Sequence, residues 1–132
     1  MSSSRRFARE LALQTLYGTE VGHRQPDEML GETTARIEGS DGRAFVKDLV
    51  TGTLEHADES DALIAPLLEG WTLERLPTID RIVLRMGMFE LLHRTETPAP
   101  VVINEAVELA KKFSTEDSGR FVNGVLSRAA RG

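Results

Sequence analysis

The sequence predicts an all-α domain, on three observations. Apolar residues recur at helical spacing in successive segments of the 132 residues. No segment shows the strict alternation of a half-buried strand, and stretches that contain Pro or Gly separate the helical segments. The segment Thr78–His93 is apolar on two roughly opposite sides, which is typical of a helix surrounded by others. We therefore predict that Thr78–His93 is the central helix of the domain.

Four helices and a short turn are predicted before the central helix. They span about 5–20, Pro26–Ile37, about 43–57 and about 60–68, with the turn at Thr72–Leu76. Pro26 suits the first turn of a helix, where a backbone N–H has no helical partner to lose. Pro66 should kink or shorten the fourth helix, because it removes an interior hydrogen bond. Trp71, the only Trp of the chain, is predicted to fill the core.

Two helices are predicted after the central one. A rigid break at Pro98–Pro100 precedes helices of about 101–113 and about 117–131. The first has apolar residues at i, i+3, i+7 and i+10, which predict a buried face. The second follows a capping turn at Ser114–Asp117. Its predicted core stripe consists of Val122, Val125, Leu126 and Ala129.

The composition fits one globular domain spanning residues 1–132. Forty per cent of the residues are hydrophobic and 28% are charged, which are ordinary values. The absence of Cys excludes disulfides and thiolate metal sites and fits a reducing compartment. No apolar run approaches the roughly 20 residues that cross a bilayer, and no signal-peptide segment follows the first arginines. We therefore expect a cytoplasmic protein.

The charges are unevenly distributed along the chain. The net charge is −5, but residues 1–24 carry four basic and two acidic side chains, and residues 81–132 carry eight and six. Residues 25–80 carry four basic and thirteen acidic side chains. Because a local patch decides where phosphates bind, the two basic ends would form one nucleic-acid surface if they met. The alternative interpretation is that these basic side chains lie on ordinary solvent-exposed helix faces and bind no nucleic acid.

The sequence contains no recognisable catalytic motif. His23, His56 and His93 lie in separate segments without metal-ligand spacing. No nucleophile elbow, phosphate-binding loop or dinucleotide-binding glycine pattern is present. We predict no enzymatic activity, no cofactor and no metal site.

Two helix flanks could contact a partner. Leu13 and Tyr17 lie one turn apart on a charged side of the first helix, and Tyr is favoured at interfaces; packing within the domain is the alternative. On the last helix, Phe121 lies beside Gly124 and Arg128, where a base could stack with a charge nearby for phosphate. The alternative there is that Phe121 packs on a neighbouring helix and Gly124 permits a close helix crossing.

Three sequence blocks occur in a specific order along the chain. They are Arg6–Tyr17 (RFARELALQTLY), Leu76–Leu91 (LPTIDRIVLRMGMFEL) and Pro100–Leu126 (PVVINEAVELAKKFSTEDSGRFVNGVL). Together they closely resemble the NusB family of bacterial transcription antitermination factors. The run INEAVELAKKF followed by FVNGVL is highly specific for that family.

The resemblance implies an all-helical fold of about seven helices in two perpendicular three-helix subdomains, here about 4–57 and 58–132. It implies binding to the boxA sequence of nascent, single-stranded leader RNA, notably of ribosomal RNA operons. The family binds this RNA together with NusE, a ribosomal small-subunit protein, and joins an RNA polymerase complex that resists termination. The resemblance implies neither a reaction nor a cofactor.

By position, the resemblance also implies two sets of binding residues. The RNA-binding set is Arg5, Arg6 and Arg9 for phosphates, with Asp117, Ser118, Arg120 and Phe121 around the bases. The NusE-binding set is Tyr17 and Asp80, with Glu74 and Arg75 nearby. Asp80 lies off the first apolar stripe of the central helix and is expected to face outward.

This chain departs from the family pattern at its N-terminus, where the basic cluster is sparse. We therefore expect weak RNA binding without NusE and a shallow salt dependence. Some family members dimerise, so a monomer and a homodimer both remain open.

Two alternative functions remain open. One is a helical adaptor that binds only protein, which sequence-selective boxA binding would exclude. The other is a stand-alone relative of the NusB-like domain of RNA cytosine methyltransferases. The chain has no Cys nucleophile and ends at Gly132, which argues against this second alternative.

Overall fold

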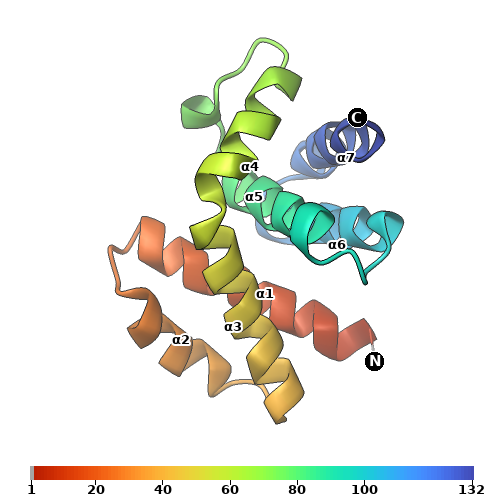
Figure 1. The fold of residues 1–132 in the computed structure, drawn as a ribbon. Coiled ribbons are helices and arrows are strands. Elements are labelled where there is room, and N and C mark those ends of the chain that lie inside the picture. The colour runs from red at the N-terminus through yellow and green to blue at the C-terminus, as the bar shows by residue number, and fades with distance from the viewer. Residues whose placement is uncertain (1) are drawn as a thin grey trace. The chain divides into compact units, whose positions relative to one another are not determined.

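The all-α prediction is confirmed by a computed structural model, which describes residues 2–132, with side chains from residue 4 onward. The described residues form seven α-helices and two short 3-10 helices, without a strand (Figure 1). The elements are α1 (Ser2–Glu20), α2 (Pro26–Thr34), α3 (Ser40–Glu55), α4 (Ala57–Ile64), η1 (Ala65–Leu67), η2 (Leu73–Arg75), α5 (Thr78–His93), α6 (Ala99–Phe113) and α7 (Glu116–Arg131).

The boundaries of the elements follow local sequence signals. The central helix α5 has the predicted bounds, Thr78–His93. Pro66 ends the α-helical region as predicted, because α4 stops at Ile64 and residues 65–67 continue as the tighter η1. The helix α3 begins at Ser40, inside the predicted loop, since Gly39 adopts a φ of 89° and reverses the chain there.

The chain divides into two compact units, the first ending at Leu54 and the second beginning at Glu55. The N-terminal unit contains α1, α2 and nearly all of α3. The Thr15 and Thr33 hydroxyls are 2.7 Å apart and link α1 to α2 in the interior. Buried apolar residues of this unit are Ala8, Leu11, Ala12, Leu13, Leu16, Leu30, Ile37, Val46, Leu49 and Val50.

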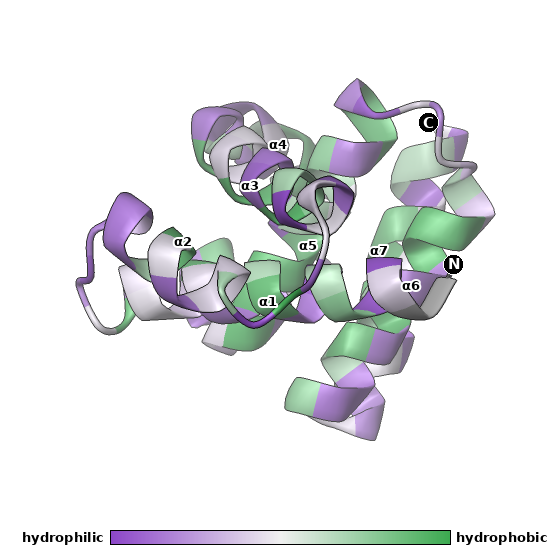
Figure 2. Ribbon diagram, turned by 90° about the horizontal axis from the view of Figure 1, so that it is seen from below, coloured by the Kyte–Doolittle hydropathy of each residue, from purple (hydrophilic) through white to green (hydrophobic). Residues whose placement is uncertain are grey.

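The C-terminal unit is built around α5, which packs against α4, α6 and α7. Residues on both sides of α5 are buried, including Ile82, Leu84, Met86 and Met88. The prediction of a helix surrounded by others is therefore confirmed. In Figure 2 the helices carry hydrophobic and hydrophilic residues in alternating patches, which is the pattern of amphipathic helices. Among the described residues, no helix has the length and apolar character needed to cross a membrane.

Two glycines within helices of this unit have opposite surroundings. A Cβ added at Gly87 of α5 would lie 2.7 Å from Cδ1 of Leu126, which is fully buried on α7. A Cβ added at Gly124 of α7 would meet no atom within 4 Å. Gly87 therefore permits close packing of α5 on α7, whereas no contact among the described residues requires glycine at position 124.

We expect Gly124→Ala to raise the free energy of unfolding by about 0.5–1 kcal/mol, because Ala is the better helix former. Gly87→Ala gains the same propensity but overpacks the α5–α7 contact, so we expect a net loss of about 1 kcal/mol. Urea denaturation of the two variants beside the parent chain measures both values. Equal effects at the two positions would contradict the close α5–α7 packing.

Candidate functional site

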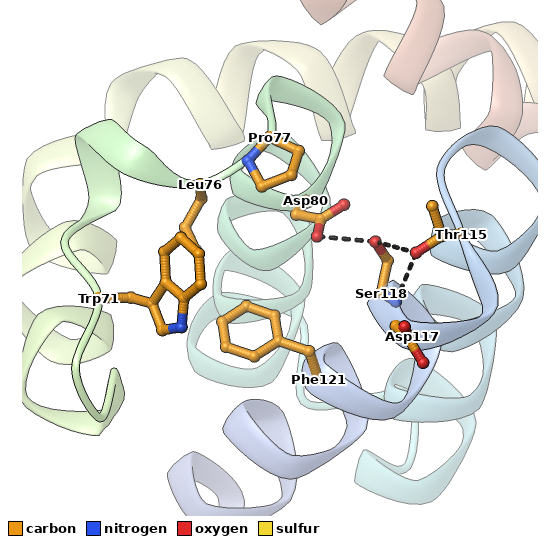
Figure 3. A pocket seen from close by; sticks show the side chains of 8 residues that line it. All are labelled: Trp71, Leu76, Pro77, Asp80, Thr115, Asp117, Ser118 and Phe121. Carbon is orange, nitrogen blue, oxygen red and sulfur yellow. Dashed lines mark hydrogen bonds between the residues drawn. The ribbon is translucent and has the colours of Figure 1, made fainter.

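A surface pocket of about 280 Å³ lies in the C-terminal unit (Figure 3). Three parts of the chain form it: the segment before α5, the first turn of α5 and the beginning of α7. Its lining residues are Trp71, Leu76, Pro77, Asp80, Thr115, Asp117, Ser118 and Phe121. The pocket therefore combines predicted RNA-binding residues of α7 with Asp80, which was predicted for the NusE surface.

A chain of hydrogen bonds fixes the beginning of α7 against α5. Thr115 caps α7, since its Oγ1 accepts a hydrogen bond of 3.0 Å from the Ser118 backbone N–H. The Ser118 hydroxyl donates a hydrogen bond of 2.8 Å to Oδ2 of Asp80 (Figure 3). Ser118 and Asp80 are both buried, so this bond forms away from bulk water. It sets the position of the first turn of α7, which also carries Phe121.

Asp80 is only 4% exposed, so the prediction that it faces outward is wrong. The physical reason is its partner: the buried Ser118 hydroxyl holds the carboxylate in the interface between α5 and α7. Its second oxygen, Oδ1, is buried without a hydrogen-bond partner among the described residues. A buried acceptor of this kind favours a ligand or a water molecule that can donate a hydrogen bond.

Two aromatic side chains flank the pocket. Figure 3 shows the Trp71 indole and the Phe121 phenyl ring extending toward one another from opposite sides. Trp71 is 55% exposed, so its predicted place in the core is wrong. The neighbouring Leu68 and Leu76 are buried instead and anchor this segment, which leaves the indole at the rim. Phe121 is partly exposed, as expected of a platform on which a planar ring could stack.

Arg128 holds the segment that precedes Trp71 against α7. Its guanidinium donates hydrogen bonds to the carbonyl oxygens of Leu67 (3.0 Å) and Gly124 (3.2 Å) and pairs with Glu69 (3.2 Å). The predicted phosphate-facing role of Arg128 therefore gives way to a structural one, because these acceptors already occupy its donors. The alternative proposed for Gly124 is also wrong, since no helix crosses closely there.

The predicted phosphate-binding arginines differ in exposure. Arg5 and Arg6 are exposed on α1, and the Arg5 guanidinium lies 4.0 Å from the Phe45 ring centroid. Arg9 is only 5% exposed, and its guanidinium lies 5.1 Å from the same centroid. The contact of Arg9 with phosphate stays a prediction, and α1 places this side chain inside the N-terminal unit. Arg120 is exposed and pairs with Asp117.

The remaining predicted protein-binding residues are at the surface. Tyr17 is exposed on α1, and Glu74 and Arg75 are exposed in η2. Leu13, predicted to share a surface with Tyr17, is buried. Leu13 therefore packs within the domain, which was the alternative to a partner surface. The apolar face of α1 is wider than the stripe predicted from the spacing of its apolar residues.

Four lining residues were not predicted as site residues from the sequence: Trp71, Leu76, Pro77 and Thr115. Trp71 is the aromatic one among them. A signal for Trp71 was available in the sequence: it follows Gly70, where the fourth helix is predicted to end, and precedes the polar Thr72 of the predicted turn. A large aromatic residue in such a turn has few neighbours to cover it. Exposure of a Trp outside regular helices is thus the pattern that could have identified it.

Comparison with known proteins relates this chain to one family. The NusB family model matches residues 6–131. The transcription antitermination protein NusB of Symbiobacterium thermophilum is 43% identical, with 98% of this chain and 90% of that protein covered. The NusB protein of Geobacillus kaustophilus is 48% identical, with 94% and 93% covered.

Solved structures show the same likeness. A crystal structure of the antitermination factors NusB and NusE in complex with dsRNA contains a chain that matches with a TM-score of 0.89 and 32% identity. That match covers 99% of this chain and 98% of the other. T. maritima NusB matches with a TM-score of 0.89 and 35% identity, covering 96% and 90%.

We expect Ser118→Ala to lower the free energy of unfolding by about 1–3 kcal/mol, because it leaves the buried Asp80 carboxylate without its donor. Urea denaturation measures the loss. Ser114→Ala is the matched control, since the Ser114 hydroxyl lies 3.0 Å from that of Ser118 and is not bonded to Asp80. A loss at Ser118 no larger than that at Ser114 would show that the Asp80 bond contributes little.

Proposed function

The chain belongs to the NusB family of transcription antitermination factors, and we propose from this how it recognises nascent RNA. In our proposal it binds boxA leader RNA together with NusE in the cytoplasm and joins the RNA polymerase antitermination complex, notably on ribosomal RNA operons. Its contribution is binding without catalysis. The observation that carries this proposal is the pocket with two aromatic rings and two carboxylates.

The chemistry of the pocket favours bases over phosphates. Trp71 and Phe121 offer ring faces on which a base can stack, and such stacking contributes about 1–3 kcal/mol per base. Asp117 is exposed, so its carboxylate repels phosphate but can accept hydrogen bonds from the amino and imino groups of bases. Asp80 lines the same pocket but is buried and bonded to Ser118. A base must leave its helical stack to enter between these groups, which favours single-stranded RNA.

The phosphates require cations, and we propose Arg5, Arg6 and Arg120 for them. All three are exposed. The ion pair of Arg120 with Asp117 lies at the surface, where such pairs contribute little, so a phosphate can compete for the guanidinium. In this proposal Arg9 does not contact a phosphate itself. Its guanidinium packs beside the Phe45 ring and supports the first turns of α1, which carry Arg5 and Arg6.

We propose that Tyr17, Glu74 and Arg75 contact NusE. A solved relative is a NusB protein in complex with NusE and dsRNA, and residues 25–80 of this chain are strongly acidic. Such a region complements a basic partner, which favours fast and selective association. Asp80 is too deeply buried for direct contact, and we assign it to positioning α7 and to the base pocket.

A binding titration tests the proposal. We expect boxA RNA to bind more tightly than a scrambled RNA at about 0.15 M salt, and the preference to increase when NusE is added. A boxA duplex should bind more weakly than the single strand. Equal binding of boxA and scrambled RNA in both conditions would favour an adaptor that binds only protein. Tighter binding of the duplex would exclude the stacking pocket as the recognition element.

We expect Phe121→Ala and Trp71→Ala each to weaken boxA binding by about 1–3 kcal/mol, because each removes a stacking surface. NusE binding should remain unchanged in both. Tyr17→Ala is the matched aromatic control, with the opposite result expected: weaker NusE binding and unchanged binding of RNA alone. Fluorescence anisotropy with labelled RNA and calorimetry with NusE measure the two affinities. Parallel loss of both affinities in one variant would indicate unfolding.

We expect the double variant Arg5→Ala, Arg6→Ala to bind boxA with a shallower salt dependence. Removing one arginine–phosphate ion pair should reduce the slope of log K against log salt by about 0.7. Arg36→Ala is the control, because Arg36 is an exposed arginine of the same unit whose guanidinium donates to Gln14. RNA titrations at several salt concentrations measure the slopes. An unchanged slope in the double variant would remove these arginines from the RNA surface.

A further inference from the structure

Three side chains with metal-ligating atoms converge in the C-terminal unit, away from the pocket residues. Oε1 of Glu59 lies 3.2 Å from Nδ1 of His56 and 2.7 Å from Nε2 of His93. All three ligand atoms lie within 4.8 Å of one another. His56 is the N-cap residue of α4, Glu59 is in its first turn, and His93 is the last residue of α5. Helix packing thus joins two histidines that are far apart in sequence.

We propose that His56, Glu59 and His93 form a binding site for a divalent cation of the Zn²⁺ type. Two imidazole nitrogens and one carboxylate oxygen are a ligand set that Zn²⁺ favours over Mg²⁺ or Ca²⁺, which prefer oxygen ligands. Their side chains are 34%, 48% and 30% exposed, so an ion can enter and water can complete its coordination. This site lies beyond the RNA- and NusE-binding functions proposed above.

Two of the three spacings between ligand atoms are close to those around such an ion. With metal–ligand bonds of about 2.0–2.2 Å, tetrahedral ligand atoms lie about 3.3 Å apart. The His56–Glu59 distance of 3.2 Å already fits, and the His93–Glu59 distance of 2.7 Å has to open slightly as the ion replaces their hydrogen bond. The hydrogen bonds of Glu59 with both histidines place its carboxylate against the two rings, where it can supply an oxygen ligand.

The surroundings of the cluster limit how far the rings can move. The His56 and His93 rings stack with centroids 3.9 Å apart, and each lies near the buried Phe89 ring, at 5.7 and 5.9 Å. Phe89 forms an apolar wall behind both imidazoles, so modest rotations of the two rings about their side-chain bonds would aim both nitrogens at one ion. Binding therefore requires the two rings to rotate out of their stacked arrangement.

The charges around the cluster partly favour a cation. Glu55 and Asp58 are exposed neighbours of the ligands in sequence and add negative charge. Asp61 is engaged by a two-point ion pair with Arg85, at 2.7 Å for both contacts, and does not supply a fourth ligand. Arg94 opposes a cation, but its guanidinium lies over the Phe89 ring and donates to the His93 carbonyl oxygen. Water is then the expected fourth ligand.

A bound ion would join the start of α4 to the end of α5. It would therefore stabilise the folded C-terminal unit by an amount that grows with the logarithm of the ion concentration above the Kd, because the unfolded chain does not hold the three ligands together. The competing interpretation is that the same three groups form only a hydrogen-bonded His–Glu–His cluster.

Calorimetric titration of the full chain, freed of any histidine tag, with ZnCl₂ tests the proposal. We expect one Zn²⁺ bound per chain, a Tm that rises with Zn²⁺ concentration, and no comparable effect of MgCl₂. Co²⁺ should develop the visible absorption of a four-coordinate site. Absence of a saturable Zn²⁺ site would overturn the proposal and leave the hydrogen-bonded cluster.

Ligand variants locate the site. His56→Gln, Glu59→Gln and His93→Gln should each weaken Zn²⁺ binding at least about tenfold, as loss even of outer partners does at metal sites. His23→Asn is the matched control: His23 is exposed, lies in the other unit and has a φ of 55°, which Asn tolerates. It should bind Zn²⁺ as the parent chain does. Loss of binding in His23→Asn, or full binding in His93→Gln, would overturn the proposal.

The Tm of each variant, measured without metal, shows whether a loss of Zn²⁺ binding reflects loss of a ligand or loss of folding. A variant that melts cooperatively near the parent Tm and no longer responds to Zn²⁺ supports the site. If His93→Gln melts far below the parent chain, Co²⁺ absorption of His56→Gln, whose side chain is slightly more exposed than that of His93, decides instead. A parent-like Co²⁺ spectrum in that variant would overturn the proposal.

Discussion

The hydrogen bond from the Ser118 hydroxyl to the Asp80 carboxylate is the contact on which the candidate site depends. It is buried, and it joins the first turn of α7 to the first turn of α5. Both helix N-termini favour a nearby negative charge, so one carboxylate serves two helices. Phe121 follows Ser118 by three residues, and its direction is therefore fixed by a bond that it does not make itself.

The side of the pocket that carries Trp71 is held by a second, separate set of contacts. Arg128, two turns further along α7, binds the Leu67 carbonyl oxygen and Glu69, and these residues precede the turn at Gly70. One helix thus positions both aromatic rings: Phe121 directly and Trp71 through the segment that Arg128 holds. The two carboxylates line the pocket near Ser118 and not between the rings (Figure 3), while the cations assigned to phosphate are not among the lining residues. The proposed function therefore assigns base recognition and phosphate recognition to different residues.

Helix periodicity predicted the fold well but the site only in part. The bounds of α5 and the effect of Pro66 follow from local rules that act within a few residues. The exposures of Arg9, Leu13, Trp71 and Asp80 do not, because each depends on a neighbour distant in sequence. Asp80 is buried by a partner 38 residues away, and the convergence of His56 with His93 depends on how α4 packs on α5. Spacing along one helix carries no information about such contacts.

The exposed indole at the rim of the pocket has a practical consequence. Trp71 is the only Trp in the chain, and more than half of its surface faces solvent. Its intrinsic fluorescence therefore arises from one place, next to the proposed base-binding surface. Emission from a solvated indole shifts in wavelength and intensity when an aromatic ligand covers it. The protein thus carries its own optical reporter of pocket occupancy, which needs no attached label.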